Sequence, residues 1–344
     1  MLEEQNRINE LNSAKKNWHL WGCYLSERQW GTVREDYSEN GDAWKYLTHN
    51  NSRSRAYRWG EDGIAGISDE NQNLCFAISM WNGKDPILKE RLFGLNNFEG
   101  NHGEDVKELY YYLENTPTHS YMRYLYKYPI AEFPYDQLLN ENKKRGKDQP
   151  EFEITDSNIF DGNNYFDIEI EYAKADFDDI LIRITVSNRS ENAASIKLLP
   201  VLWFRNTWDF GLTDSKPQLS LKNGNRILCS HPSLSDYNLH FQQAERVLFT
   251  ENESNAKVLW NVENQNPFKK DAFHNAVIDS DFGIFADKCE GTKASPVYSI
   301  ELLSSESRTI KLRLSRQEFE NPFHTSFDDI FTKRIAEANE FYKQ

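Results

Sequence analysis

The sequence predicts an all-β fold, namely an antiparallel β-supersandwich preceded by a short N-terminal lead and followed by a C-terminal helix. Apolar and polar residues alternate along most of the stretch from residue 151 to residue 315. Short clusters rich in Asn and Gly separate the alternating runs, as between residues 161 and 164. Alternation places one face of a strand on a core, and short turns favour antiparallel sheets packed face to face. No strand–helix–strand rhythm is visible, which disfavours a parallel α/β fold.

Three runs in the second half of the chain alternate most clearly, and two earlier segments, 74–81 and 108–113, are also strand-like. Turns are expected at Asn40-Gly41 and Asn82-Gly83, because these pairs tolerate positive φ. The residues expected to face the core are Phe166, Ile168, Ile170 and Tyr172 in the first run, Ile180, Ile182, Ile184 and Val186 in the second, and Ile310, Leu312 and Leu314 in the third.

The segments outside the sandwich differ from it in composition and in the secondary structure that they predict. Residues 1–17 form a charged lead that is either a short helix or a frayed end, and residues 136–150 are interpreted as a helix end plus a loop. Ser326 can cap a final helix, in which apolar residues recur at helical spacing. Its apolar stripe either folds back on the sheet or leads into a further domain. We therefore expect a lead at 1–17, a supersandwich domain at 18–318 and a linker helix at 319–344.

Composition limits the classes of function. The chain has 344 residues and a net charge of -14, so a nucleic-acid partner is unlikely because the phosphate backbone would be repelled. No run is apolar enough to span a bilayer, and the polar start does not look like a secretory signal. The four cysteines are far apart and form no CxxC pair. These features favour a cytoplasmic protein without a membrane partner.

Motifs for metals, nucleotides and catalytic nucleophiles are missing from the sequence, so no cofactor is expected. One loop brings His102 close to Glu104 and Asp105 along the chain. Such a trio can bind a cation, but a polar loop with acidic neighbours is the favoured interpretation, since no second cluster supplies matching ligands. We therefore expect no metal. His119, His231 and His274 are isolated and are interpreted as structural.

Tryptophan, arginine and acidic residues interleave in the first third of the chain. Trp can stack on a sugar ring, while Arg and carboxylates can hydrogen-bond sugar hydroxyls. The alternative is an internal Arg–acid network that holds irregular loops around buried Trp, and both interpretations stay open. The candidate substrate-binding residues are Arg28, Trp30, Arg34, Glu35, Asp36, Arg58, Trp59, Glu61 and Asp62.

The run from Trp21 to Tyr37 (WGCYLSERQWGTVREDY) resembles the opening of bacterial glucosidases of glycoside hydrolase family 63. Trp21-Gly22-x-Tyr is also similar to a motif of the eukaryotic processing mannosyl-oligosaccharide glucosidase. The resemblance covers almost the whole chain. Further similar runs are 53–66, 81–105, 116–129, 199–208, 270–279 and 291–294.

The resemblance implies an N-terminal supersandwich followed by a helical (α/α)₆ toroid that hydrolyses α-linked glucosides with inversion. Inversion uses an acid and a base about 6.5–9.5 Å apart. In the family both lie in the toroid, and no residue here matches either, so no catalytic residue is assigned. The chain is then expected to frame a sugar pocket for an α-linked glucosyl oligosaccharide or glucoside, and to need a helical catalytic domain in cis or in trans.

Two other hypotheses remain. The chain could be a free-standing carbohydrate-binding or partner-docking module. It could also be a self-sufficient enzyme, which ranks last because it needs an acid pair from Glu35, Asp36, Glu61, Asp62 or Asp209. If the chain is a domain without its toroid, the final helix and one sandwich face should expose an apolar patch.

Overall fold

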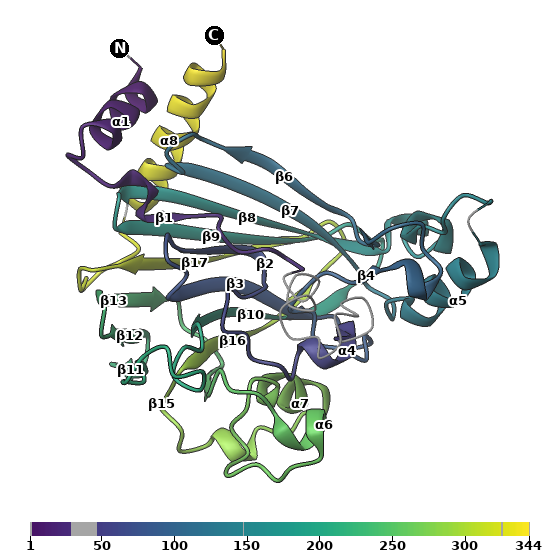
Figure 1. Cartoon of the computed structure of the whole chain (residues 1–344). Coiled ribbons are helices and arrows are strands. Elements are labelled where there is room, and N and C mark those ends of the chain that lie inside the picture. The colour runs from purple at the N-terminus through teal and green to yellow at the C-terminus, as the bar shows by residue number, and fades with distance from the viewer. Residues whose placement is uncertain (1, 29–46, 147, 325, 344) are drawn as a thin grey trace.

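The structure is a computed structural model, and it describes residues 2–28, 47–146, 148–324 and 326–343. Two large β-sheets pack face to face, as Figure 1 shows, and the named strands within each sheet pair antiparallel. The predicted sandwich fold is confirmed. In the order of the smaller sheet, its six strands are β1 (Trp21–Gly22), β2 (Ile64–Asp69), β3 (Leu74–Trp81), β10 (Ala194–Phe204), β16 (Lys293–Leu302) and β14 (Arg246–Thr250).

The larger sheet has nine strands, and a separate two-stranded sheet joins β4 (Gly94–Leu95) to β5 (Asp105–Val106). In sheet order the nine strands are β15 (Glu290–Gly291), β11 (Gln218–Lys222), β12 (Arg226–His231), β13 (Leu234–Phe241), β17 (Ser307–Ser315), β9 (Asp179–Asn188), β8 (Tyr165–Asp176), β7 (Tyr121–Pro129) and β6 (Tyr110–Asn115). Four of the eight neighbouring pairs in this sheet are joined by short connections, namely β6–β7, β8–β9, β11–β12 and β12–β13, in agreement with the turn-like clusters of the sequence.

The core lies between the two large sheets. The residues predicted to face it, in β8, β9 and β17, are buried, and they belong to one continuous apolar cluster with side chains of β3 and β10. The alternation predicts this because successive side chains of a strand point to opposite faces. The strand predicted at 74–81 is β3, and the one predicted at 108–113 is β6, shifted by two residues. At the predicted Asn82-Gly83 turn Gly83 has a φ of 78°, whereas Asn40-Gly41 lies outside the described residues.

Six α-helices are described in these ranges: α1 (Glu3–Asn12), α4 (His49–Ser52), α5 (Tyr135–Arg145), α6 (Ala256–Trp260), α7 (Ala272–Ile278) and α8 (Ser326–Tyr342). The segment 136–150, interpreted as a helix end plus a loop, contains most of α5. Among the described residues, no helix is both long enough and apolar enough to cross a membrane.

The final helix folds back on the larger sheet. Phe327, Phe331 and Ala338 on its apolar stripe are buried against Tyr121 of β7 and Leu181 of β9. The expectation that this helix exposes an apolar patch is therefore wrong, because the sheet covers the stripe. In Figure 1, α8 stands beside α1 at one end of the sandwich, and the two termini lie near each other.

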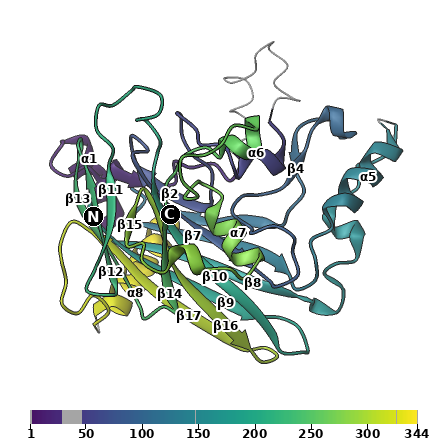
Figure 2. The ribbon, with the colours of Figure 1, turned by 90° about the horizontal axis from the view of Figure 1, so that it is seen from below.

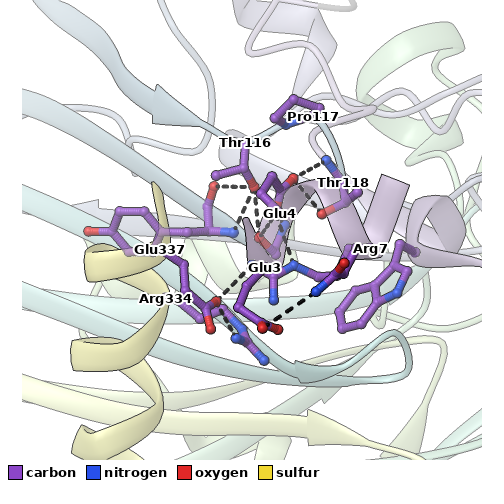
Figure 3. A network of polar contacts seen from close by, with 12 residues as sticks. Glu3, Glu4, Arg7, Thr116, Pro117, Thr118, Arg334 and Glu337 are labelled. Carbon is purple, nitrogen blue, oxygen red and sulfur yellow. Dashed lines mark hydrogen bonds and ion pairs between the residues drawn. The ribbon is translucent and has the colours of Figure 1, made fainter. Parts of the chain in front are cut away.

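A buried polar network joins the two terminal helices (Figure 3). Glu4 of α1 accepts hydrogen bonds from the backbone amide and hydroxyl of Thr118 at 2.8 and 2.6 Å. Arg7 donates to Glu4 at 2.9 Å and to Glu337 of α8 at 2.7 Å. Arg334 of α8 also donates to Glu337. The N-terminal lead is thus a helix fixed on the sandwich.

Short helices cover the outer face of the smaller sheet. Figure 2 shows α7 beside β10 and β14, with α6 nearby. Phe273 and Val277 of α7 pack in one apolar cluster with Leu199 and Val201 of β10. The smaller sheet is therefore buried on both faces, and the site described next lies on this outer face.

Candidate functional site

The candidate site is a buried cluster of three carboxylates and three cations, which we call the charge cluster: Glu61, Asp62, Glu90, Arg91, Lys270 and Lys293. They surround a cavity of about 20 Å³ together with Asn252 and the side chains of Ala77, Val201 and Trp203. Because these last three lie on β3 and β10, the cavity sits on the outer face of the smaller sheet.

Four separate segments bring the charged side chains together. Glu61 and Asp62 directly precede β2, Lys270 precedes α7, and Lys293 begins β16. Glu90 and Arg91 follow a short backbone pairing between Lys89 and Met80 of β3, with hydrogen bonds of 2.9 and 3.0 Å.

Gly63 allows the segment that carries Glu61 and Asp62 to lie close against β3. A Cβ at Gly63 would come within 2.4 Å of the Cβ of Ala77, which is closer than two carbons can approach. A glycine is therefore required here so that the two acids can reach the cavity.

Each acid of the charge cluster has one close cation. Arg91 Nε lies 2.7 Å from Asp62 Oδ2, Lys270 Nζ lies 3.0 Å from Glu61 Oε2, and Lys293 Nζ lies 2.9 Å from Glu90 Oε1. All six side chains are at most 6% exposed, so the pairs are shielded from water and from salt. Ions buried this deeply are tolerated only when they are paired.

The electrostatics of the charge cluster keep Glu90 ionised. Burial alone would raise the pKa of Glu90, but the charges of Lys293 and Arg91 lower it to about 2. Burial lowers the pKa of Lys293, opposed by Glu90, while the neighbouring carboxylates raise that of Arg91 despite its burial. A carboxylate held in this way is a fixed anion and does not serve as a proton donor near neutral pH.

The candidate residues predicted from the sequence fall into four groups. Glu61 and Asp62 lie in the charge cluster, in agreement with an internal Arg–acid network. Arg28 pairs with Glu104 instead. The guanidinium of Arg58 lies 5.2 Å from the ring centre of Trp59, which is 49% exposed and so could present a face to a ligand. The other four, Trp30, Arg34, Glu35 and Asp36, lie outside the described residues.

Sequence reasoning did not single out Glu90, Arg91, Lys270 or Lys293. A signal was nevertheless present, because each of them falls in one of the runs that carry the family resemblance. Those runs are far apart in the chain, yet 53–66, 81–105, 199–208, 270–279 and 291–294 all contribute residues to this cavity. Asn252, Ala77 and Ser79 complete the lining from outside the runs.

The loop around His102 does not assemble a cation site from the three residues considered. His102 donates its backbone amide to Glu151 at 2.7 Å, and Glu104 pairs with Arg28. Oxygen atoms of Asp105, Glu151 and Glu153 do lie within 4.8 Å of one another.

An ammonium group already bonds to all three acids of this second trio. Lys107 Nζ donates to Asp105, Glu151 and Glu153 at 3.2, 2.7 and 2.6 Å. The lysine satisfies the carboxylates as a metal ion otherwise would.

Comparisons with known proteins identify one long relative. No family model matches the chain. The chain is similar to the uncharacterized protein YMR196W of Saccharomyces cerevisiae, with 39% identity over 388 aligned positions that include 98% of this chain. It spans about a third of that protein, 35% of its length.

Two solved structures are similar at low identity. A protein from the human microbiome provisionally named kojibiose phosphorylase has 12% identity and a TM-score of 0.28, covering 52% of this chain and 21% of that one. The polysaccharide lyase BACCELL_00875 has 10% identity and a TM-score of 0.32, covering 78% of this chain and 28% of that one.

Proposed function

We propose that this chain is the β-sandwich domain of an inverting α-glucosidase-like glycoside hydrolase, in which it frames the sugar pocket without supplying the catalytic acid and base. The observation that carries the proposal is the charge cluster. The runs that resemble family 63 glucosidases meet there, and the carboxylates in it are ion-paired rather than poised for proton transfer.

The ion pairing of the carboxylates distinguishes a framing role from a catalytic one. An inverting hydrolase needs a protonated acid on one side of the glycosidic bond and a carboxylate that activates water on the other. A general acid therefore needs a raised pKa. Glu90 has a lowered pKa, and Glu61 and Asp62 each lie within 3.0 Å of a buried cation. The charge cluster thus serves to fix loops, including the one that carries Trp59.

The length of the yeast relative agrees with this role. A protein about three times as long contains a region similar to this entire chain. Its remaining length is ample for a second domain that would hold the acid and the base.

A second candidate function is free-standing carbohydrate binding, and the exposure of Trp59 favours it. The indole is half exposed and an arginine lies against it, a combination that suits stacking on a sugar ring. The two candidate functions differ in whether another domain is needed for a detectable affinity.

The test is an assay of the purified chain with p-nitrophenyl α-glucoside and with α-linked gluco-oligosaccharides. We expect no turnover above a protein-free control. Turnover that Asp62→Asn abolishes would overturn the proposal and make the chain an enzyme.

Calorimetric titration of the chain with the same oligosaccharides tests the second candidate. Saturable binding that Trp59→Ala weakens about tenfold, a change of about 1.4 kcal/mol, would support direct sugar binding. Tyr111→Ala, which removes another exposed aromatic ring on β6, the edge strand of the larger sheet, is the matched control and should leave the affinity unchanged. The absence of binding by the chain alone, with binding by the full-length protein, would support the framing role.

A further inference from the structure

Three of the residues that line the cavity within the charge cluster each carry a hydrogen-bond acceptor that the described residues leave unsatisfied. Asp62 Oδ1, Glu90 Oε2 and Asn252 Oδ1 are buried and have no hydrogen-bond partner among the described residues. Buried acceptors of this kind are rare, because each costs the free energy of removing it from water.

The protein's own donors reach only the other carboxylate oxygens, Asp62 Oδ2 and Glu90 Oε1. Both protons of the Asn252 amide nitrogen are used, on Glu61 at 3.1 Å and on the carbonyl of Phe204 at 2.9 Å. Lys270 Nζ is 3.9 Å from Asp62 Oδ1, and Arg91 Nη1 is 3.7 Å from Glu90 Oε2. Both separations are too long for a direct hydrogen bond, and such gaps are typically bridged by a bound group.

Charge and size define the group that fits. An anion is disfavoured because the three free atoms are all acceptors. A metal or ammonium ion is disfavoured because three cations already balance the three carboxylates, so a further positive charge would be uncompensated. The cavity of about 20 Å³ has room for one water-sized group. The group that fits the cavity is therefore neutral and donates hydrogen bonds.

We propose that this cavity is a binding site for one ordered water molecule, which donates its two protons to acceptors among Asp62, Glu90 and Asn252. Lys293 can donate a further hydrogen bond to this water. Lys293 Nζ donates to Glu90 Oε1 at 2.9 Å and to the carbonyl of Lys270 at 3.0 Å, which leaves its third proton for the water oxygen. The water would tie the loop before β2 to the segment after β3. This proposal does not depend on the proposed carbohydrate function.

A pair of isosteric substitutions tests the site in solution. Val201 lines the cavity, and Val297 is equally buried in the same apolar cluster without lining it. Threonine has the shape of valine but carries a hydroxyl, which is destabilising in an ordinary core. We expect Val297→Thr to lower the Tm by several degrees, and Val201→Thr to lower it much less, because the new hydroxyl bonds to the water or takes its place. An equal loss of Tm in both variants would overturn the proposal.

A crystal structure of the full chain at a resolution that reveals other buried waters provides the direct test. We expect one density peak within hydrogen-bond distance of at least two of the three acceptors. No peak at that position would overturn the proposal. An anomalous signal there after soaking the crystals in Rb⁺ would also overturn it, since it would identify a monovalent cation site.

Discussion

Arg7 near the N-terminus and Glu337 near the C-terminus form a buried ion pair of 2.7 Å, which joins two helices from opposite ends of the chain. Glu337 also lies 2.5 Å from Arg334, and Arg7 lies 2.9 Å from Glu4. Glu4, Arg7, Arg334 and Glu337 thus form one continuous network of ion pairs between the two helices (Figure 3).

Removing Glu337 should be strongly destabilising. Glu337→Ala would leave Arg7 and Arg334 buried without their shared carboxylate, and breaking a buried pair in this way costs about 3–5 kcal/mol. Urea unfolding curves measure the loss. Lys333→Ala is the control, because it removes another cation beside Glu337. The Lys333 side chain is 64% exposed and its Nζ lies at the longer distance of 3.8 Å from Glu337 Oε1, so its removal should change the free energy of unfolding little. Equal losses in the two variants would contradict a role for burial.

Truncating Phe331 should detach the final helix from the sheet. Its ring is fully buried among Tyr121, Leu181 and Phe327, and a Phe→Ala change at such a site costs about 3–5 kcal/mol. Limited proteolysis should then cleave α8 faster than in the wild type. Tyr342→Ala, at a 54% exposed position of the same helix, should leave the cleavage rate close to that of the wild type.

Gly291 should not accept a side chain. A Cβ at this position would lie 2.3 Å from the backbone oxygen of Thr250, and a backbone atom cannot move aside as the end of a side chain can. Gly291→Ala should therefore lower the free energy of unfolding by about 1–3 kcal/mol. At Gly103 a Cβ would meet no atom within 4 Å, so Gly103→Ala should have little effect. Thermal unfolding of both variants provides the comparison.

His274 should make stability fall in mild acid. Burial, and secondarily the charge of Arg53, lower the pKa of His274 from 6.5 to about 4. Between these values the unfolded chain binds a proton that the folded chain does not, so the free energy of unfolding decreases as the pH falls from about 6.5 to about 4.

The slope of Tm against pH over that window measures the effect. We expect His274→Gln to flatten the slope, whereas His324→Gln at an exposed position should preserve it. A slope unchanged by His274→Gln would assign the acid sensitivity to other groups.

Much of the sandwich could be predicted because the alternation that forms it is local. The core positions of β8, β9 and β17 were recognisable from neighbouring residues alone, and so was the presence of a final amphipathic helix, although α8 is shorter than the expected segment 319–344. Residues 136–150 were interpreted as a helix end plus a loop, and the full extent of α5 was not predicted, since its polar, lysine-rich sequence has few apolar positions to reveal a helix.

The candidate site could be predicted only in part. Glu61 and Asp62 stood out because Trp and Arg surround them in the sequence. Asp62 pairs with Arg91, which is 29 residues away, and Glu61 pairs with Lys270, which is 209 residues away. No local pattern marks a pairing at such separations.

The sequence by itself determined the class of fold, the faces of its strands and the amphipathic final helix, because these depend on the spacing of apolar residues along a few turns or strands. Only the tertiary structure decided that the apolar stripe of α8 is covered by the sheet and that both terminal helices share one ion network. It also decided that Glu61 and Asp62, for which sugar binding and an internal network were both open, are paired with buried cations. The physical reason is that burial and charge pairing are properties of three-dimensional neighbourhoods, and antiparallel sheets bring together residues that lie far apart in the chain.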